Sequence, residues 1–480
     1  MRYSEGMAAN NQGRNRFRDD AEAIWRAAFA AVEPSRLVRR SVVREGNGLR
    51  IGGRTFDLAG YERVFLIAFG KAAWPMSEAL AAILGDRLTS GLVAAPGTGG
   101  CSSGRRQGES FAAGAGRRVP GLEYYEASHP SPDGRSVARA RRAIEVAQNA
   151  GANDLVLVAV SGGGSSLLSL PAEGITLGEK RGVADGLLRA GASIHELNAV
   201  RKHLSAVKGG RLSQAAFPAA VVTLAISDVV GDDPGTIGSG PTHWDASTFA
   251  GAREVLERYG LWATAPASVR SRLERGAAGE IAESLKEGDP VFARAFTAVV
   301  GDNMTALRAA KAEADARDFE TVFLTSSDGG EARKAARNYA AFLAEMACSA
   351  VLLPRPLCLL AGGELAVTVK GKGRGGRNTE FVLAALLEMA KENTERLDWL
   401  ILSLGTDGVD GPTDAAGAFV DGTTVQRAAT AQLNPDAALA DNDSYSFFAC
   451  LGDHFRCGPT GTNVMDIKIA LLPAVSGPHQ

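Results

Sequence analysis

The chain has 480 residues, of which 45% are hydrophobic and 22% charged. This balance is ordinary for a globular protein and excludes a disordered chain, a fibre or a coiled coil. The formal net charge of −2 excludes the broad positive surface that is typical of nucleic-acid-binding proteins. The length favours two or three domains.

Neither a signal peptide nor a membrane span is expected. Residues 1–19 lack an apolar core segment, and their Asn, Gly and Arg content indicates a flexible tail. No apolar run approaches the roughly 18 residues of a membrane helix. The five cysteines are odd in number and widely spaced, which favours a reducing compartment, the cytoplasm, over a disulfide framework. Cys450, His454 and Cys457 leave a zinc site open as a minor alternative.

Short apolar runs alternate with helical patterns along the chain. A strand is predicted at 64–68 and a helix over 72–84, and a second strand at 155–160 enters a glycine-rich turn. Further strands are predicted at 220–226, 298–300, 322–325, 365–369 and 400–404. Continuous Val, Ile and Leu runs indicate strands buried on both faces, and the intervening helices indicate parallel units. The predicted fold class is α/β, with mainly parallel sheets flanked by helices.

Two segments interrupt this alternation. Gly97–Val119 is rich in Gly, Ser and Arg and is predicted to be an inserted loop, and 275–290 carries the mixed charge of a linker. We therefore expect an N-terminal α/β domain over 20–290 and a C-terminal α/β domain over 291–476.

The clearest local signal is the sequence SGGGSS after the strand at 155–160. Its members are Ser161, Gly162, Gly163, Gly164, Ser165 and Ser166. Three glycines let backbone N–H groups converge, and a helix that begins there adds partial positive charge. The segment predicts a site for phosphate or another anion, with a tight turn and a capping serine as the alternative.

A second glycine-rich segment, 371–378 (GKGRGGRN), contains Arg377 and Asn378. Gly371, Gly373 and Gly376 match the dinucleotide-binding pattern, but the acidic residue that should follow a second strand is not in place. The three cations of the segment suit phosphate or carboxylate oxygens, with a solvated basic turn as the alternative.

Two acidic loops follow predicted strands. One contains Asp407 and Asp410, and the other contains Asp228. Such loops lie at the edge of an α/β sheet where ligands bind, and Mg²⁺ needs only one or two carboxylates. Solvated turns with capping aspartates are the alternative.

Cationic residues lie at further turns. Arg201 and Lys202 can clamp a small anion, although a solvent-facing helix end fits equally well. Lys71 lies where a strand meets a helix N-terminus, a position that favours a bound anion beside it. His129 lies in a rigid double-proline loop, where a structural role is favoured over chemistry. Glycine-rich turns, cations and carboxylates at strand ends together favour phosphoryl transfer.

Taken together, these segments resemble the class II glycerate 2-kinases, whose C-terminal part is the MOFRL domain. The matching blocks, in the family's order, are Phe69–Ala73, Ser128–Asp133, Ser161–Ser166, Asn198–Gly210, Ser227–Thr242, Gly362–Asn378, Gly405–Ala418 and Asp443–Ile467. They extend over nearly the whole chain. The long segment Gly97–Val119 departs from the family pattern, as does Ser131, where an apolar residue is expected.

The resemblance implies a Rossmann-like N-terminal domain, a C-terminal MOFRL domain and an active site in the cleft between them. It implies ATP- and Mg²⁺-dependent phosphorylation of D-glycerate on its 2-hydroxyl. The family's catalytic lysine and arginine correspond to Lys71 and Arg377.

The implied mechanism gives each candidate residue a role. SGGGSS, Arg201, Lys202 and Asn378 bind anionic groups, while Lys71 and Arg377 offset charge on the transferring phosphoryl group. Asp228 is the candidate that orients the hydroxyl, and Asp407 and Asp410 are the candidate metal ligands, although these roles are interchangeable on the sequence.

Two alternatives from other classes stay open. One is an NAD(P)H-dependent hydroxypyruvate reductase, and the other is a non-catalytic protein that binds glycerate or a nucleotide. The expected partners are small molecules rather than nucleic acid or membrane. The oligomeric state is open, with a homodimer among the alternatives.

Overall fold

The computed structural model describes residues 2–96, 119–348, 356–391 and 398–473. The chain divides into two compact units. A central unit comprises Pro34–Gly301, and a terminal unit comprises Met1–Glu33 with Asp302–Gln480. The segment 275–290, which we expected to be a linker, belongs to the central unit. Apart from Val119, the expected insertion Gly97–Val119 lies outside the described residues.

The central unit is built on a six-stranded sheet in which all neighbouring strands are parallel. In sheet order the strands are β6 (Leu122–Ala127), β5 (Leu88–Pro96), β4 (Val64–Phe69), β7 (Leu155–Val160), β8 (Ala220–Ile226) and β9 (Ala295–Gly301). Every residue of β4, β7 and β8 is buried, as the continuous apolar runs predicted. The strand order runs outward in both directions from β4 and β7, which is the arrangement of dinucleotide-fold sheets.

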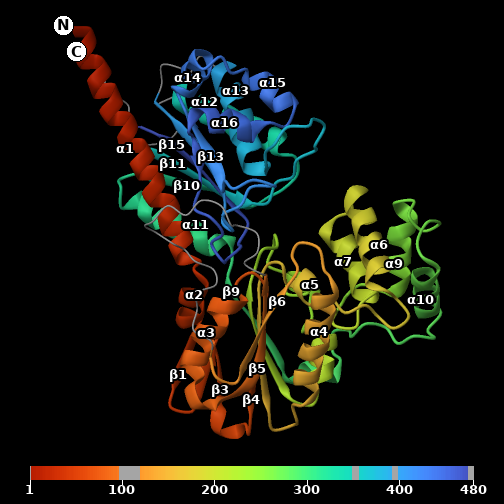
Figure 1. Ribbon diagram of the computed structural model, residues 1–480. Helices are drawn as coiled ribbons and strands as arrows, with labels where there is room; N and C mark the ends of the chain where they lie inside the picture. Colours follow the sequence, from red (N-terminus) through yellow and green to blue (C-terminus); the bar gives the residue numbers. More distant parts are fainter. Residues whose placement is uncertain (1, 97–118, 349–355, 392–397, 474–480) are drawn as a thin grey trace. The chain divides into compact units, whose positions relative to one another are not determined.

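Helices cover both faces of this sheet (Figure 1). On one face, α2 (Pro34–Ser41) packs on α3 (Ala73–Leu84), which contacts β4 and β5. On the other, α4 (Gly134–Gln148) and α8 (Arg211–Ala216) pack together. Alternate residues of β4, namely Phe65, Ile67 and Phe69, share a core with these last two helices, as the two-residue period of a strand requires.

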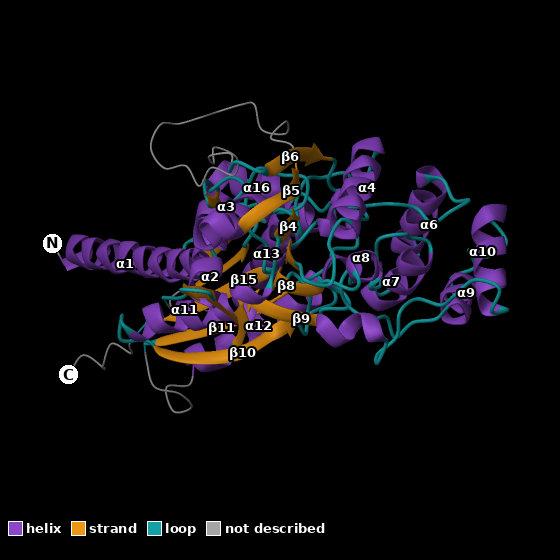
Figure 2. Ribbon diagram, turned by 90° about the horizontal axis from the view of Figure 1, so that it is seen from below, coloured by secondary structure: helices purple, strands orange, loops and turns teal. Residues whose placement is uncertain are grey.

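The remaining elements of the central unit lie outside the main sheet. Strands β1 (Val42–Glu45), β2 (Gly48–Ile51) and β3 (Arg54–Asp57) form an antiparallel sheet. Helices α6 (Leu177–Arg189), α7 (Ile194–His203), α9 (Phe249–Arg258) and α10 (Ala267–Ala277) share their own apolar core and form a group without strands in Figure 2. The short helices are α5 (Gly164–Leu167), η1 (Leu58–Gly60), η2 (Gly85–Arg87), η3 (Ile237–Ser239) and η4 (Pro290–Arg294).

The terminal unit contains a second six-stranded sheet, which is mixed. In sheet order its strands are β10 (Glu320–Asp328), β11 (Leu357–Gly363), β15 (Asp466–Leu472), β12 (Leu400–Gly405), β13 (Gly417–Asp421) and β14 (His454–Phe455). Only β10 and β11 pair in parallel, because β15 runs antiparallel between β11 and β12. The prediction of mainly parallel strands is therefore confirmed for the central unit and wrong for this sheet.

The helices of the terminal unit include one that begins near the start of the chain. They are α1 (Arg2–Ala31), α11 (Asn303–Asp315), α12 (Ala332–Cys348), α13 (Arg377–Lys391), α14 (Thr424–Thr430), α15 (Pro435–Ala440) and α16 (Ser444–Leu451). Where we expected a flexible tail over residues 1–19, the structure has the beginning of α1. A buried stripe of Ala21, Ile24 and Ala28 at helical spacing anchors this helix.

One predicted strand is misplaced. Residues 365–369 were expected to form a strand, but the strand there is β11, which ends at Gly363. Val369 is 71% exposed, and Ala366 makes only an isolated bridge to Glu331. Among the described helices, none is both long and apolar enough to cross a membrane.

Candidate active site

The candidate site of the central unit lies where the strand order of its sheet reverses. In open α/β sheets, ligands bind at the carboxyl ends of the strands on either side of such a reversal, here β4 and β7. Lys71 follows β4 and the SGGGSS segment follows β7. Asp228 follows β8, the next strand, and is partly exposed at the same edge.

The two loops are locked together at short range. The Lys71 N–H donates to the Gly162 carbonyl at 2.8 Å, and the Ala72 N–H donates to Ser161 Oγ at 3.0 Å. Gly70 has φ +128°, and a Cβ atom there would lie 2.1 Å from Ser161 Oγ. Ser161 is fully buried. Its hydroxyl therefore holds the loop that carries Lys71, and its role as an anion ligand stays a prediction.

The other hydroxyls of SGGGSS are also engaged. Ser165 Oγ lies 2.8 Å from Ser239 Oγ, and Ser166 Oγ donates to the Pro130 carbonyl at 2.5 Å. The N–H groups of Gly162 and Gly163, however, donate to no acceptor among the described residues. Helix α5 has only four residues, so its dipole is small. The capacity of this loop to bind an anion rests on its backbone N–H groups.

His129 lies beside the candidate site of the central unit, although the sequence favoured a structural role for it. A Cβ atom on Gly163 would lie 2.8 Å from His129 Cδ2 and 3.5 Å from Lys71 Cγ. The imidazole and the lysine stem therefore both lie against the same glycine. The signal in the sequence that points to His129 is its position directly before Pro130 in the double-proline loop.

The structure places Arg201 and Lys202, the predicted anion clamp, in different surroundings. Lys202 forms a buried ion pair with Asp245 at 3.0 Å, so its charge is already offset. Arg201 makes no ion pair with a described carboxylate, and burial lowers the pKa of its guanidinium. Among the described residues, neither side chain forms a hydrogen bond with SGGGSS.

Lys208 connects to the loop instead. It is 1% exposed, and its Nζ donates to the Ser165 carbonyl at 3.0 Å and to the Gly238 carbonyl at 3.3 Å. Burial lowers the pKa of this amine well below its usual value. Asn198 is a further residue that sequence reasoning missed: its Oδ1 accepts from Ser239 Oγ at 2.9 Å, and its buried Nδ2 has no recorded partner.

The terminal unit has a candidate site of its own at one edge of its sheet. The ends of β11 and β12 meet the beginning of β15 there, since Gly363 and Gly405 both pair with Asp466. Glu364 follows β11 and Asp407 follows β12. Three carboxylates thus come from three strands, and the N-terminus of α13 supplies Arg377 and Asn378.

Arg377 is held by two of these carboxylates. Its Nε and Nη2 donate to Asp466 at 2.6 and 2.9 Å, and its Nη1 lies 2.8 Å from Glu364. Burial disfavours the charged guanidinium, but Asp466 and Glu364 outweigh burial and raise the pKa of Arg377. Its side chain remains 23% exposed. Arg377 is therefore a fixed, permanently charged group at the sheet edge, and sequence reasoning missed both partners.

Asn378 lies beside Arg377 but is buried. Its Nδ2 donates to Asp410 at 3.2 Å and Asp466 at 3.1 Å, and its Oδ1 accepts from Ser403 at 2.5 Å. All recorded contacts of this amide are internal. In the structure Asn378 holds the two aspartates, and anion binding by this residue stays a prediction.

Asp410, a predicted metal ligand, caps α13. Its carboxylate accepts from the N–H groups of Asn378 and Thr379 at 2.8 and 2.9 Å, and from Thr379 Oγ1 at 2.7 Å. With the Asn378 amide these donors occupy both oxygens. Burial outweighs these donors and raises the pKa of Asp410. Asp407 is less buried, and its Oδ1 accepts from the Val409 N–H at 3.1 Å.

The glycine-rich segment at 371–378 packs closely against the chain around Asp441. No strand leads directly into it, because β11 ends at Gly363. Cβ atoms on Gly371 and Gly373 would lie 2.1 Å from the Asp441 carbonyl oxygen and 2.3 Å from Asp443 Cβ. These two glycines allow the close approach of two backbones, which is a packing reason for glycine at both positions.

The zinc alternative has no structural support. His454 stacks on Tyr445 with ring centroids 4.5 Å apart, and burial together with Arg456 lowers the pKa of His454 to about 4. Across the described residues, no group of three or more His, Cys, Asp or Glu side chains is arranged to hold a metal ion.

Comparisons with known proteins agree over nearly the whole chain. Residues 20–274 match a domain of unknown function, DUF4147, and residues 357–466 match the MOFRL family. The chain is 39% identical to a D-glycerate 2-kinase from Thermotoga maritima, over 94% of this chain and 97% of that protein. A glycerate 2-kinase from Pyrococcus horikoshii is 37% identical, with 94% and 96% covered.

Two further matches complete the comparison. A putative hydroxypyruvate reductase from Agrobacterium vitis is 39% identical, with 94% of this chain and 93% of that protein covered. The crystal structure of a glycerate kinase from Thermotoga maritima matches with a TM-score of 0.78 at 36% identity, over 95% of this chain and 100% of that chain.

Proposed function

The chain belongs to the family of glycerate 2-kinases that carry a MOFRL domain, and from this membership we propose that it transfers the γ-phosphoryl group of ATP to the 2-hydroxyl of D-glycerate. The product is 2-phosphoglycerate. The observation that carries this proposal is that Lys71 and the unused N–H groups of Gly162 and Gly163 lie together at the reversal point of the central sheet.

The reaction needs an attacking oxygen, a proton acceptor and charge neutralisation. The 2-hydroxyl oxygen of glycerate attacks the γ-phosphorus, and the bond to the bridging oxygen of ADP breaks. We assign the departing hydroxyl proton to the Asp228 carboxylate. Lys71 and Arg377 offset charge on the transferring phosphoryl group, and the loop N–H groups hold one anionic group of the substrates.

The residues at the terminal sheet edge fit a magnesium ion through Asp407. The four donors around Asp410 leave its oxygens no capacity for a metal, whereas Asp407 is less buried and at a strand end. One carboxylate together with nucleotide phosphates is a usual Mg²⁺ environment. When bound, Mg²⁺ neutralises negative charge on those phosphates.

The location that follows from this proposal is the cytoplasm, where ATP is available. It agrees with the state of Cys358, Cys450 and Cys457, which are all free thiols. Small molecules remain the proposed partners.

A phosphorus NMR assay of the purified full chain with ATP, Mg²⁺ and D-glycerate tests the function. We expect 2-phosphoglycerate and ADP in equal amounts. Formation of 3-phosphoglycerate would contradict the regiochemistry, and absence of any phosphorylated glycerate would contradict the kinase. In the same preparation, NADH or NADPH oxidation by hydroxypyruvate would instead support the reductase.

A further inference from the structure

A pocket of about 450 Å³ opens in the central unit on the α4 and α8 side. None of its lining residues belongs to SGGGSS or to the loop that carries Lys71. Its polar lining comprises Arg211, Arg272, Glu173, Ser205, Gln148 and Gln214, and the rest is Ile144 with three alanines. Its volume falls in the range of pockets that hold small organic molecules, roughly 300–1,000 Å³.

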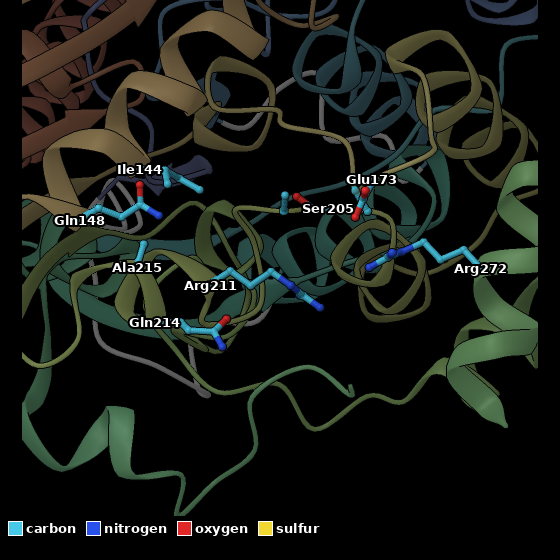
Figure 3. A pocket seen from close by; sticks show the side chains of 10 residues that line it. Ile144, Gln148, Glu173, Ser205, Arg211, Gln214, Ala215 and Arg272 are labelled. Carbon is cyan, nitrogen blue, oxygen red and sulfur yellow. The ribbon is translucent and has the colours of Figure 1, made fainter. Parts of the chain in front are cut away.

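Two guanidinium groups define the chemistry of this pocket. Figure 3 shows Arg211 and Arg272 extending toward each other from opposite sides, with Glu173 near the tip of Arg272. Each is anchored by backbone carbonyls on one side only. Arg211 Nη1 donates to the carbonyls of Lys202 and Lys208 at 3.3 and 3.1 Å, and Arg272 Nε donates to the His203 carbonyl at 2.8 Å.

Both anchored arginines retain N–H groups that can donate to a ligand. Arg211 Nε and Nη2, and both Nη atoms of Arg272, have no hydrogen-bond acceptor among the described residues. Neither arginine forms an ion pair within 4.0 Å with a described carboxylate. Planar forks held in this way suit bidentate binding of oxyanions.

The positive charge around the pocket exceeds the negative charge. Lys180 is 5% exposed, and its Nζ donates only to the Leu170 carbonyl at 3.5 Å. Burial and the nearby charges of Arg201 and Arg211 lower the pKa of Lys180 to about 7. Burial, followed by repulsion from Arg211, also lowers the pKa of Arg272. Glu173 is the single carboxylate of the lining.

We propose that this pocket is a binding site for a small organic phosphate. Arg211 and Arg272 bind the phosphate oxygens through their remaining N–H groups. The pocket has two guanidinium groups and one exposed carboxylate, that of Glu173. This charge balance favours a dianionic ligand, such as a phosphate, over a ligand with a single carboxylate. The amides of Gln148 and Gln214 line the space left for the organic part, and the small apolar side chains form its walls.

The test is calorimetric titration of the full chain carrying Lys71→Ala, which weakens anion binding at the sheet reversal. The probes are inorganic phosphate, 2-phosphoglycerate and glycerate. We expect 2-phosphoglycerate to bind at least fivefold more tightly than phosphate, and glycerate to bind most weakly. Equal affinity for phosphate and 2-phosphoglycerate would overturn the organic ligand, and tightest binding of glycerate would overturn the phosphate.

Three further substitutions in the same background identify the pocket. Arg272→Gln should weaken 2-phosphoglycerate binding about tenfold or more, because one charge-assisted contact is lost. Arg270→Gln, on the same helix but outside the pocket, should leave the affinity unchanged. Glu173→Gln removes a negative charge from an exposed side chain and should tighten binding two- to threefold.

If Arg272→Gln does not fold, Glu173→Gln still tests the proposal. Glu173 makes no hydrogen bond to another described residue, so we expect this variant to fold. Unchanged affinity in both Arg272→Gln and Glu173→Gln would overturn the pocket assignment. So would the absence of any 2-phosphoglycerate binding to the Lys71→Ala chain.

Discussion

Lys71 is fixed through its backbone, by the Gly162 carbonyl at 2.8 Å, so its side chain can be shortened without loosening the loop. We expect Lys71→Ala to lower kcat by roughly 10²–10³, the usual effect of losing one charge-stabilising group in a transition state. Steady-state phosphorylation of D-glycerate measures it. Lys334→Ala, an exposed lysine on α12, is the control. Near-normal kcat in Lys71→Ala would remove this residue from the mechanism.

The places of single residues were predictable where the signal is contiguous. Lys71 and the SGGGSS glycines follow strands as expected, because a strand, a turn and a helix start follow one another along the chain. The partners of Arg377 could not be found in this way. Asp466 is 89 residues away and reaches Arg377 only because β15 pairs with both β11 and β12. The sequence predicts Ser161 as an anion ligand. It does not show that Ser161 Oγ accepts a hydrogen bond from the Ala72 N–H.

At the scale of the loop, Gly163 combines two constraints that only glycine meets. Its φ is +81°, and a Cβ atom would meet His129 at 2.8 Å. We expect Gly163→Ala to displace the imidazole or the lysine stem and to lower kcat at least tenfold, because small misplacements of catalytic groups are costly. Circular dichroism should show an unchanged secondary structure.

The matched control is Gly182→Ala on α6, where no atom lies within 4 Å of the added carbon and the backbone is helical. This substitution should raise the free energy of unfolding by about 0.5–1 kcal/mol. Equal activity of the two variants would mean that Gly163 does not position the site.

The two acidic residues after β12 should respond differently to amide substitution. Asp410→Asn disturbs a buried cap of α13 and should cost about 2–3 kcal/mol of stability, with no change in the Mg²⁺ concentration that gives half-maximal activity. Asp407→Asn should raise that concentration on the order of tenfold and leave the denaturation midpoint unchanged. Urea unfolding and a Mg²⁺ titration of activity measure both effects, and the reverse pattern would exchange the two roles.

Elements were predictable when their apolar run was continuous and bounded. The strands at 155–160 and 220–226 coincide with β7 and β8. The error at 365–369 arose because alternating Leu, Val and Thr residues follow the true strand directly. Strand direction in the terminal sheet was not predictable, because β15 is inserted between β11 and β12 by a connection with no local signature.

At the scale of the whole molecule, burial of Lys180 lowers the free energy of unfolding by an amount that depends on pH. Its pKa is about 7 in the folded chain and about 10.4 in an unfolded one. Between these values the unfolded state binds more protons, so stability rises with pH. We expect Lys180→Met to stabilise the protein at pH 7.5, with a gain about 2–3 kcal/mol smaller at pH 9.5.

Urea unfolding at the two pH values measures this gain. Lys334→Met should show no such dependence, since Lys334 is exposed. A gain in Lys180→Met that is the same at both pH values would mean that Lys180 is not desolvated in the folded chain.

The position of β15 in the terminal sheet also has a consequence for biosynthesis. The central unit is one continuous stretch, Pro34–Gly301, whereas the terminal unit joins α1 to residues that follow Asp302. On the ribosome, the central unit can fold as soon as its last strand emerges. The terminal sheet cannot close until Asp466–Leu472 is translated, because β11 and β12 each pair with that strand. During this interval both strands present open edges, and a nascent chain stalled before β15 would be a substrate for chaperones.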